Sequence, residues 1–127
     1  MIKILLVDDE FEVRRGWRMR LNLETDMTVV GEAPNAEKAL AVAKATQPDV
    51  VLLDVRLPGP DGLSTIQQLH QAAPGCKVII VTIYDSPRRR LLAKDTGAAA
   101  FIAKQEPSEH LLVAIREVGQ PTTMRKD

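Results

Sequence analysis

The sequence has few of the features that mark several protein classes. It has one cysteine, Cys76, which excludes a disulfide framework or a cysteine zinc site within a single chain. Only 3% of the residues are aromatic, so the core has to be built from aliphatic side chains. The 17 basic and 17 acidic residues leave no net charge. Net charge therefore gives no electrostatic reason to expect binding to nucleic acid or to a membrane surface.

Long hydrophobic runs are missing too. The apolar N-terminal stretch ends at Asp8, too soon for a signal peptide, and the later apolar runs are no longer than a β-strand. A single unpaired thiol suits a reducing compartment. Hydrophobic residues make up 45% of the 127 residues, enough for one domain with its own core. We therefore expect a cytoplasmic protein with no membrane partner.

Short aliphatic runs alternate regularly with helix-compatible segments. Runs of this length with little polar alternation are typical of parallel strands that are buried on both faces. They cover residues 2–7, 27–30, 50–53, 78–82 and 98–103, and the segments between them predict helices over 10–23, 36–46, 63–73, 87–97 and 107–118. Asn35 is a suitable helix cap, and Pro87 and Pro107 suit the first turn of a helix. The order predicts an α/β fold, an open doubly wound sheet with helices on both faces.

The domain boundary is expected near the last predicted helix. Residues 1–119 would form the domain. Residues 120–127 are polar, and we expect a flexible tail or the start of a linker there.

The residues that follow the strands are the best candidates for a functional site, because sites in open parallel sheets form at the carboxyl ends of the strands. Four of the five predicted strands end in polar residues that we assign to one site: Asp8-Asp9, Asp54, Thr82 and Lys104. The second strand is followed by Gly31-Glu32, to which we assign no role.

Three carboxylates at one edge repel one another and call for a positive partner. A hard divalent cation such as Mg²⁺ fits, because it prefers a few carboxylate oxygens plus water. Asp54 would lie between the metal and Lys104, where a carboxylate can attack phosphorus and form an aspartyl-phosphate. The ammonium group and the Thr82 hydroxyl would then stabilise the phosphoryl oxygens.

These residues resemble the response-regulator receiver domain of two-component signalling. The resemblance runs from residue 2 to residue 118, and its motifs stand in order at receiver spacing. They are residues 5–10, 49–62, 81–82 and 97–104. The resemblance implies the flavodoxin-like form of the fold, with five βα units and the strand order 2-1-3-4-5.

The resemblance also implies the metal ligands and the phosphorylation site. Asp54 would accept a phosphoryl group from a sensor histidine kinase. Asp9 and Asp54 would bind Mg²⁺ directly, together with the backbone carbonyl of Arg56. Asp8 would act mostly through a metal-bound water.

The same resemblance implies a switch. Thr82 and Lys104 would contact the phosphoryl group, and Phe101 stands where the family keeps a rotating aromatic residue. Thr82 and Phe101 would change the partner-binding surface. The chain would catalyse only its own phosphorylation and dephosphorylation, so it would not be an enzyme in the metabolic sense.

One departure from the common pattern narrows the resemblance. Lys104 is followed by Gln105-Glu106-Pro107, where receivers commonly have proline directly after the lysine. Together with residues 30–33 and 54–59, this is similar to the LuxR/NarL-type subgroup of transcriptional regulators. That subgroup normally adds a helix-turn-helix domain, through which any DNA contact would be made. A truncated chain and a stand-alone receiver both remain open, and a second copy of the chain is a candidate partner.

A second departure concerns the lifetime of the phosphoryl group. Position 84 is Tyr rather than a small residue, and with Arg56 it would flank the line of attack on the acyl phosphate. We expect the pair to hinder water, so Tyr84→Ala should shorten the lifetime.

Two other functions are open to the same fold. A Mg²⁺-dependent aspartyl-phosphate phosphohydrolase would need an acid two residues after Asp54, where Arg56 stands, and a cap domain. A flavodoxin-like cofactor binder would need a phosphate-binding loop after the first strand, where the acids 8–10 would repel phosphate. A receiver that no longer uses phosphate is disfavoured by the complete set of acids, threonine and lysine.

Several of the residues that the sequence singles out also have a purely structural interpretation. Asp8 and Asp9 could cap the first helix. The arginines at 14, 15, 18 and 20 and at 88–90 form either solvated faces or partner surfaces. His70 and His110 are expected on helix surfaces, and Cys76 is expected to be an inert core thiol.

Overall fold

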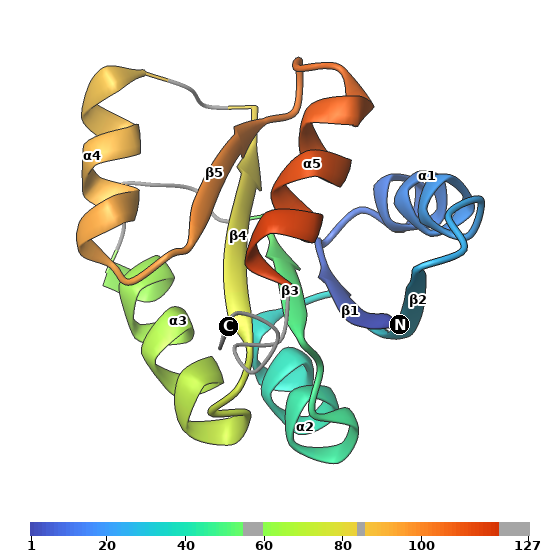
Figure 1. The fold of residues 1–127 in the computed structure, drawn as a ribbon. Helices are drawn as coiled ribbons and strands as arrows, with labels where there is room; N and C mark the ends of the chain where they lie inside the picture. Colours follow the sequence, from blue (N-terminus) through green and yellow to red (C-terminus); the bar gives the residue numbers. More distant parts are fainter. Residues whose placement is uncertain (55–59, 84–85, 120–127) are drawn as a thin grey trace, which may run out of the picture.

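The computed structural model describes residues 1–54, 60–83 and 86–119 and consists of alternating strands and helices (Figure 1). The elements are β1 (Ile2–Val7), α1 (Phe11–Leu21), β2 (Met27–Ala33), α2 (Ala36–Thr46), β3 (Val50–Leu53), α3 (Pro60–Ala72), β4 (Lys77–Thr82), α4 (Pro87–Asp95), β5 (Ala100–Ala103) and α5 (Ser108–Val118). Within these ranges no helix has the length and apolar character needed to cross a membrane.

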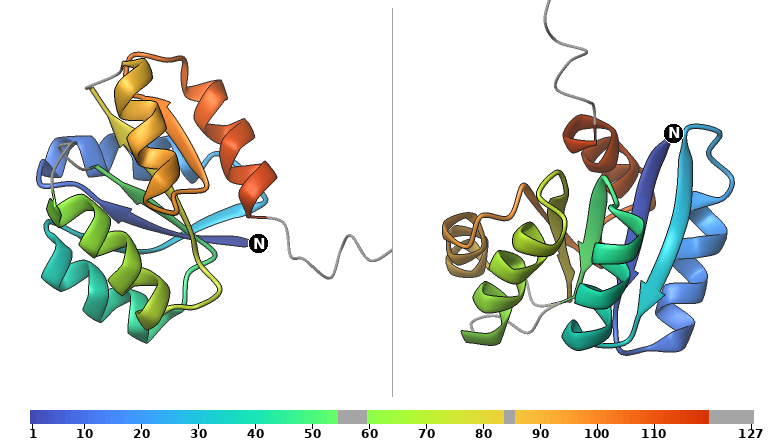
Figure 2. Two further views of the ribbon diagram at one scale, coloured as in Figure 1. Left: turned by 90° about the vertical axis from the view of Figure 1, so that its left-hand side faces the viewer. Right: turned by 90° about the horizontal axis from the view of Figure 1, so that it is seen from below.

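All strand pairs of the sheet are parallel, and the strand order is β2-β1-β3-β4-β5. This order confirms the predicted flavodoxin-like doubly wound sheet. Helices α1 and α5 cover one face, and α2, α3 and α4 cover the other, as two perpendicular views show (Figure 2). The chain switches direction across the sheet between β1 and β3, which places the ends of these two strands side by side.

The core has two layers because successive side chains of a strand point to opposite faces of the sheet. In β1, Leu5 and Val7 pack under α2 and α3, whereas Ile4 and Leu6 pack under α1 and α5. The central strands β1, β3 and β4 are buried almost completely, which is why they read as continuous aliphatic runs.

The expectation of burial on both faces is wrong for the two edge strands. Most residues of β2 and β5 are only partly buried, because each edge strand has a neighbour on one side alone. Several element boundaries also differ from the sequence prediction. Strand β2 continues to Ala33, helix α1 ends at Leu21 rather than residue 23, and α3 already begins at Pro60.

Local contacts explain why two short sequence signals matter. The Asn35 side chain accepts a hydrogen bond of 2.9 Å from the Lys38 amide and caps α2, as predicted. Gly31 lies beside an irregularity in the β1–β2 register, and a Cβ atom there would lie 2.5 Å from Cγ1 of Val42. Glycine at this position therefore allows α2 to pack closely on β2.

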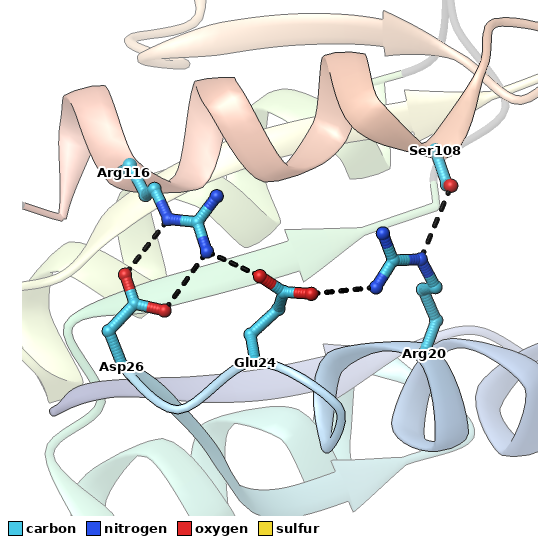
Figure 3. A network of polar contacts seen from close by, with 5 residues as sticks. All are labelled: Arg20, Glu24, Asp26, Ser108 and Arg116. Atoms are coloured by element: carbon cyan, nitrogen blue, oxygen red, sulfur yellow. Dashed lines mark hydrogen bonds and ion pairs between the residues drawn. The ribbon is translucent and has the colours of Figure 1, made fainter.

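A network of ion pairs connects α5 to the end of α1 and to the segment before β2 (Figure 3). Arg116 lies 2.6 Å from Glu24 and 2.9 Å from Asp26, and Arg20 lies 2.8 Å from Glu24 and 3.4 Å from the Ser108 hydroxyl. Hydrogen bonds from Arg20 and Arg116 hold the pKa of Glu24 below its usual range. The network pairs Arg20, one of the arginines whose role the sequence left open, within the chain.

Candidate functional site

The neighbouring ends of β1 and β3 bring two predicted acids together with the predicted lysine. The amide of Asp54 donates to the Val7 carbonyl at 3.0 Å, which continues the β1–β3 pairing beyond the strands. Lys104 comes directly after β5, and its ammonium lies 2.9 Å from Oδ2 of Asp8 and 3.3 Å from Oδ2 of Asp54. One cation therefore joins two carboxylates that lie far apart in the sequence.

Asp8 is the most constrained residue of this edge. It is 1% exposed, and each of its polar atoms has a partner. Its amide donates to the Ala33 carbonyl, its carbonyl accepts from Arg14, its Oδ1 accepts from the Glu10 amide, and its Oδ2 binds Lys104. The Asp8 carboxylate thus organises the loop before α1. The N-cap position of α1 is taken by Glu10 and not by Asp8, and the Glu10 side chain forms no capping hydrogen bond.

Three carboxylates of this loop face a common point. Oxygen atoms of Asp8, Asp9 and Glu10 lie within 4.8 Å of one another, with Asp8 buried and the other two exposed. Carboxylate oxygens open to water on one side are the ligand set that Mg²⁺ prefers, so the residues present fit such an ion. Glu10 belongs to this cluster, although the sequence reasoning gave it no ligand role.

The environment of the site shifts the pKa values of its acid and its base. Burial raises the pKa of Asp54; the nearby Lys104 charge opposes this shift and the Asp8 charge adds to it. Burial alone would lower the pKa of Lys104, but the hydrogen bond to Asp8 and the charge of Asp54 outweigh it and raise the pKa. The lysine is therefore a permanent cation at neutral pH.

Thr82 and Trp17 complete the surroundings of the lysine. Thr82 ends β4, is 1% exposed, and its carbonyl accepts a hydrogen bond of 2.8 Å from the Lys104 amide. The Lys104 ammonium lies 5.7 Å from the centre of the Trp17 ring. Lys104 and Trp17 also border a hollow of about 290 Å³ between α1 and α5. The only tryptophan of the chain can thus report on the site.

Phe101 lies on β5 on the other face of the sheet, away from the acid cluster. It is half-buried against the α2–α3 core, and the Arg90 guanidinium stands 4.8 Å from its ring centre. Arg90 also binds Glu106 at 3.2 Å, and Glu106 pairs with His110 at 2.8 Å. The hydrogen bond from His110, that from the Ala103 amide and the Arg90 contact lower the pKa of Glu106.

Four other residues that the sequence singled out have the following outcomes. Arg56 and Tyr84 lie outside the described residues. Cys76 is 2% exposed, and burial raises the pKa of its thiol, in keeping with the predicted inert core cysteine. His110 lies on an exposed part of α5, as expected.

The sequence reasoning missed Arg14 and Glu32, which contact each other beside residues 8–10, the acid loop. A usable signal was present: Glu32 lies near the carboxyl end of β2, at the same edge of the sheet as Asp8. The arginines of α1 were interpreted as a possible surface, yet Arg14 and Arg18 both bind Glu32.

Comparisons with known proteins agree with this geometry. The model of the response regulator receiver domain family matches residues 4–116. Response regulator GacA of Pseudomonas aeruginosa is 39% identical over 119 residues, which cover 93% of this chain and 55% of that protein. The chain spans about half the length of the curated relatives it matches.

Two solved structures show the same fold. The signal receiver domain of the putative response regulator NarL from Mycobacterium tuberculosis has 30% identity and a TM-score of 0.82, and the match covers 93% of this chain and 95% of that one. A LuxR-family two-component response regulator from Aurantimonas has 31% identity and a TM-score of 0.83, with 92% and 84% covered. The chain belongs to the response regulator receiver domain family and lies within its LuxR/NarL-type branch.

Proposed function

We propose that this chain is a phosphorylation-dependent signalling switch whose phosphoacceptor is Asp54. The single observation that carries the proposal is the position of the Asp54 carboxylate, beside the Lys104 ammonium, which also binds Asp8 of the acid loop. An ionised carboxylate held beside a cation is ready to attack an electrophilic phosphorus. Family membership supports the same interpretation.

The phosphoryl donor would be a sensor histidine kinase. An Asp54 oxygen attacks the phosphorus of the kinase's phosphohistidine, a P–O bond forms, and the P–N bond breaks. The electron pair of that bond goes to the imidazole, which takes up a proton from water. Lys104 neutralises charge on the transferring phosphoryl oxygens, and the Thr82 hydroxyl donates a hydrogen bond to one of them.

Asp9 and Asp54 would hold Mg²⁺ directly, with the carbonyl of Arg56 as a further ligand from outside the described residues. Asp8 would contribute through water, because its two carboxylate oxygens already accept from the Glu10 amide and from Lys104. The bound ion would neutralise the charge that builds up during phosphoryl transfer.

The output would be a changed binding surface rather than a released product. Added charge at Asp54 would draw the Thr82 hydroxyl toward the phosphoryl group and favour a different position of Phe101. Autodephosphorylation would return the chain to its resting state. We propose no metabolic reaction for it.

The whole protein would act in the cytoplasm as a transcriptional regulator. Residues 1–119 would form the receiver, and residues 120–127 a flexible tail or the start of a linker. DNA would be bound only through an effector domain outside these 127 residues, and a second copy of the chain is a further candidate partner.

The test is intact-mass measurement after incubation with acetyl phosphate and Mg²⁺, for the wild type and for Asp54→Asn. We expect one phosphoryl group on the wild type and none on the variant. Modification of neither protein, or of both equally, contradicts the proposal. Release of phosphate from unrelated phosphate esters would instead favour the phosphohydrolase alternative.

A further inference from the structure

Arg14 connects the acid loop to β2. It lies one turn inside α1, and because helical side chains lean toward the helix N-terminus, its guanidinium reaches back over the loop. Its Nη1 donates to the Asp8 carbonyl at 2.5 Å, and its Nε donates to Oε1 of Glu32 at 3.1 Å. The Arg14 side chain is only 13% exposed, so water competes weakly for these bonds.

Glu32 explains why a cation is stable at this place. A positive charge near the N-terminus of a helix is unfavourable unless it is neutralised. Glu32 binds Arg14 through one oxygen and Arg18 through the other. Two arginines of α1 thus share the carboxylate of Glu32. The backbone of Glu32 is fixed in β2, where it is the register partner of Leu6 in β1.

The two arginines differ in one contact that matters for the site. Arg14 also holds the Asp8 carbonyl, which belongs to the peptide group that joins Asp8 to Asp9. Among the described residues, Arg18 has no hydrogen bond to the acid loop. Arg14 therefore fixes the orientation of the peptide from which the proposed metal ligand Asp9 projects.

We propose that Arg14, supported by Glu32, is a positioning residue for Mg²⁺ binding and phosphoryl transfer. This inference rests on the proposed function. Arg14 touches neither the metal nor the phosphoryl group. It acts through the Asp8–Asp9 peptide, whose rotation would turn the Asp9 carboxylate away from the Asp8 and Glu10 oxygens beside which it lies.

The chain offers a matched control. Arg14→Met and Arg18→Met each remove one positive charge and one bond to Glu32, but only the first also removes the bond to the Asp8 carbonyl. Loss of a nearby positive charge should by itself tighten Mg²⁺ binding. We expect Arg14→Met to weaken Mg²⁺ binding about tenfold, the lower end of the usual effect of groups that orient metal ligands. Arg18→Met should leave binding unchanged or tighten it.

The affinities are measured by calorimetric titration with Mg²⁺, and the free energy of unfolding of each variant is measured without metal. A weaker affinity in Arg14→Met than in Arg18→Met, at comparable stability, supports the inference. Equal affinities in the two variants overturn it. If Arg14→Met does not fold, Arg14→Lys and Arg18→Lys replace the pair, since lysine lacks the planar fork through which Arg14 reaches the carbonyl and the carboxylate with two separate nitrogens.

The titration also separates failure of this inference from failure of the proposed function. If the wild type binds no Mg²⁺, both are wrong. If the wild type binds Mg²⁺ and is phosphorylated on Asp54, but the two methionine variants have the same affinity, only the role of Arg14 is wrong.

Discussion

Replacing Lys104 by methionine removes the cation that joins Asp8 to Asp54 and keeps nearly the same side-chain length. Without metal, the variant leaves the buried Asp8 carboxylate and the partly buried Asp54 carboxylate facing each other. We expect the free energy of unfolding near neutral pH to fall, because removing one partner of a buried pair leaves the other charge uncompensated.

The distances set the size of the effect. A pair of unit charges 3.3 Å apart, the separation of Lys104 from Asp54, interacts by about 1 kcal/mol in water and by about 5 kcal/mol at the effective dielectric of a protein surface. The Lys104 side chain is 16% exposed, so the larger value applies more closely, but the cost of desolvating the ammonium group offsets part of it. We therefore expect a loss of about 2 kcal/mol.

The loss should depend on pH in a definite direction. Burial raises the pKa of Asp54 in the folded chain, so its ionisation costs stability as the pH rises through the folded pKa. The positive charge of Lys104 opposes this increase in the pKa of Asp54, and the variant lacks that charge. As the pH falls, protonation of Asp54 removes the uncompensated charge in the variant, so the difference from the wild type should shrink toward acid pH.

The assay is urea unfolding followed by Trp17 fluorescence, without metal, at about pH 7.5 and at about pH 5. Lys38→Met is the control, because Lys38 is exposed and has no ion pair in the described part of the chain. A loss below about 0.5 kcal/mol near neutral pH would be the size of an exposed pair. That result, or a loss that does not change with pH, would refute the electrostatic reasoning.

Three further predictions concern the frame around the site. Asn35→Ala should cost about 1 kcal/mol in urea unfolding, because the α2 cap is lost; no change would mean that another group replaces the cap. Gly31→Ala should cost about 1–3 kcal/mol through the clash with Val42, and adding Val42→Ala should recover much of it; additive losses would contradict the clash. The Cys76 thiol should react with a disulfide reagent far more slowly in the folded chain than in urea, because it is buried and its pKa is raised; equal rates would contradict its burial.

The sequence was informative where a property depends on a few consecutive residues. The aliphatic runs that became β1, β3 and β4 are buried on both faces. A polar residue that directly follows a strand of a parallel sheet lies at the carboxyl edge of that sheet. This is why Asp8, Asp54 and Lys104 could be predicted to meet. The roles of these residues in metal binding and phosphoryl transfer stay predictions.

Other features depend on which helix lies beside which strand. The sequence shows Arg14 on a helix and Glu32 after a strand, but not that the guanidinium reaches back to the Asp8 carbonyl. Phe101 could be predicted on its strand, whereas its cover by Arg90 depends on the packing of α4. The edge strands were misjudged for the same reason, since burial on both faces requires neighbours that the local sequence does not specify.

Helix α1 is secured at both of its ends. Glu32 holds its first turns to β2, and Glu24 connects its last turn to Arg116 of α5. In α4, by contrast, Ala93 is the only buried residue among those whose side chains are described. Because fewer of the described side chains of α4 are anchored in the core, we expect α4 to yield more readily than α1 to a disturbance that starts at the acid loop.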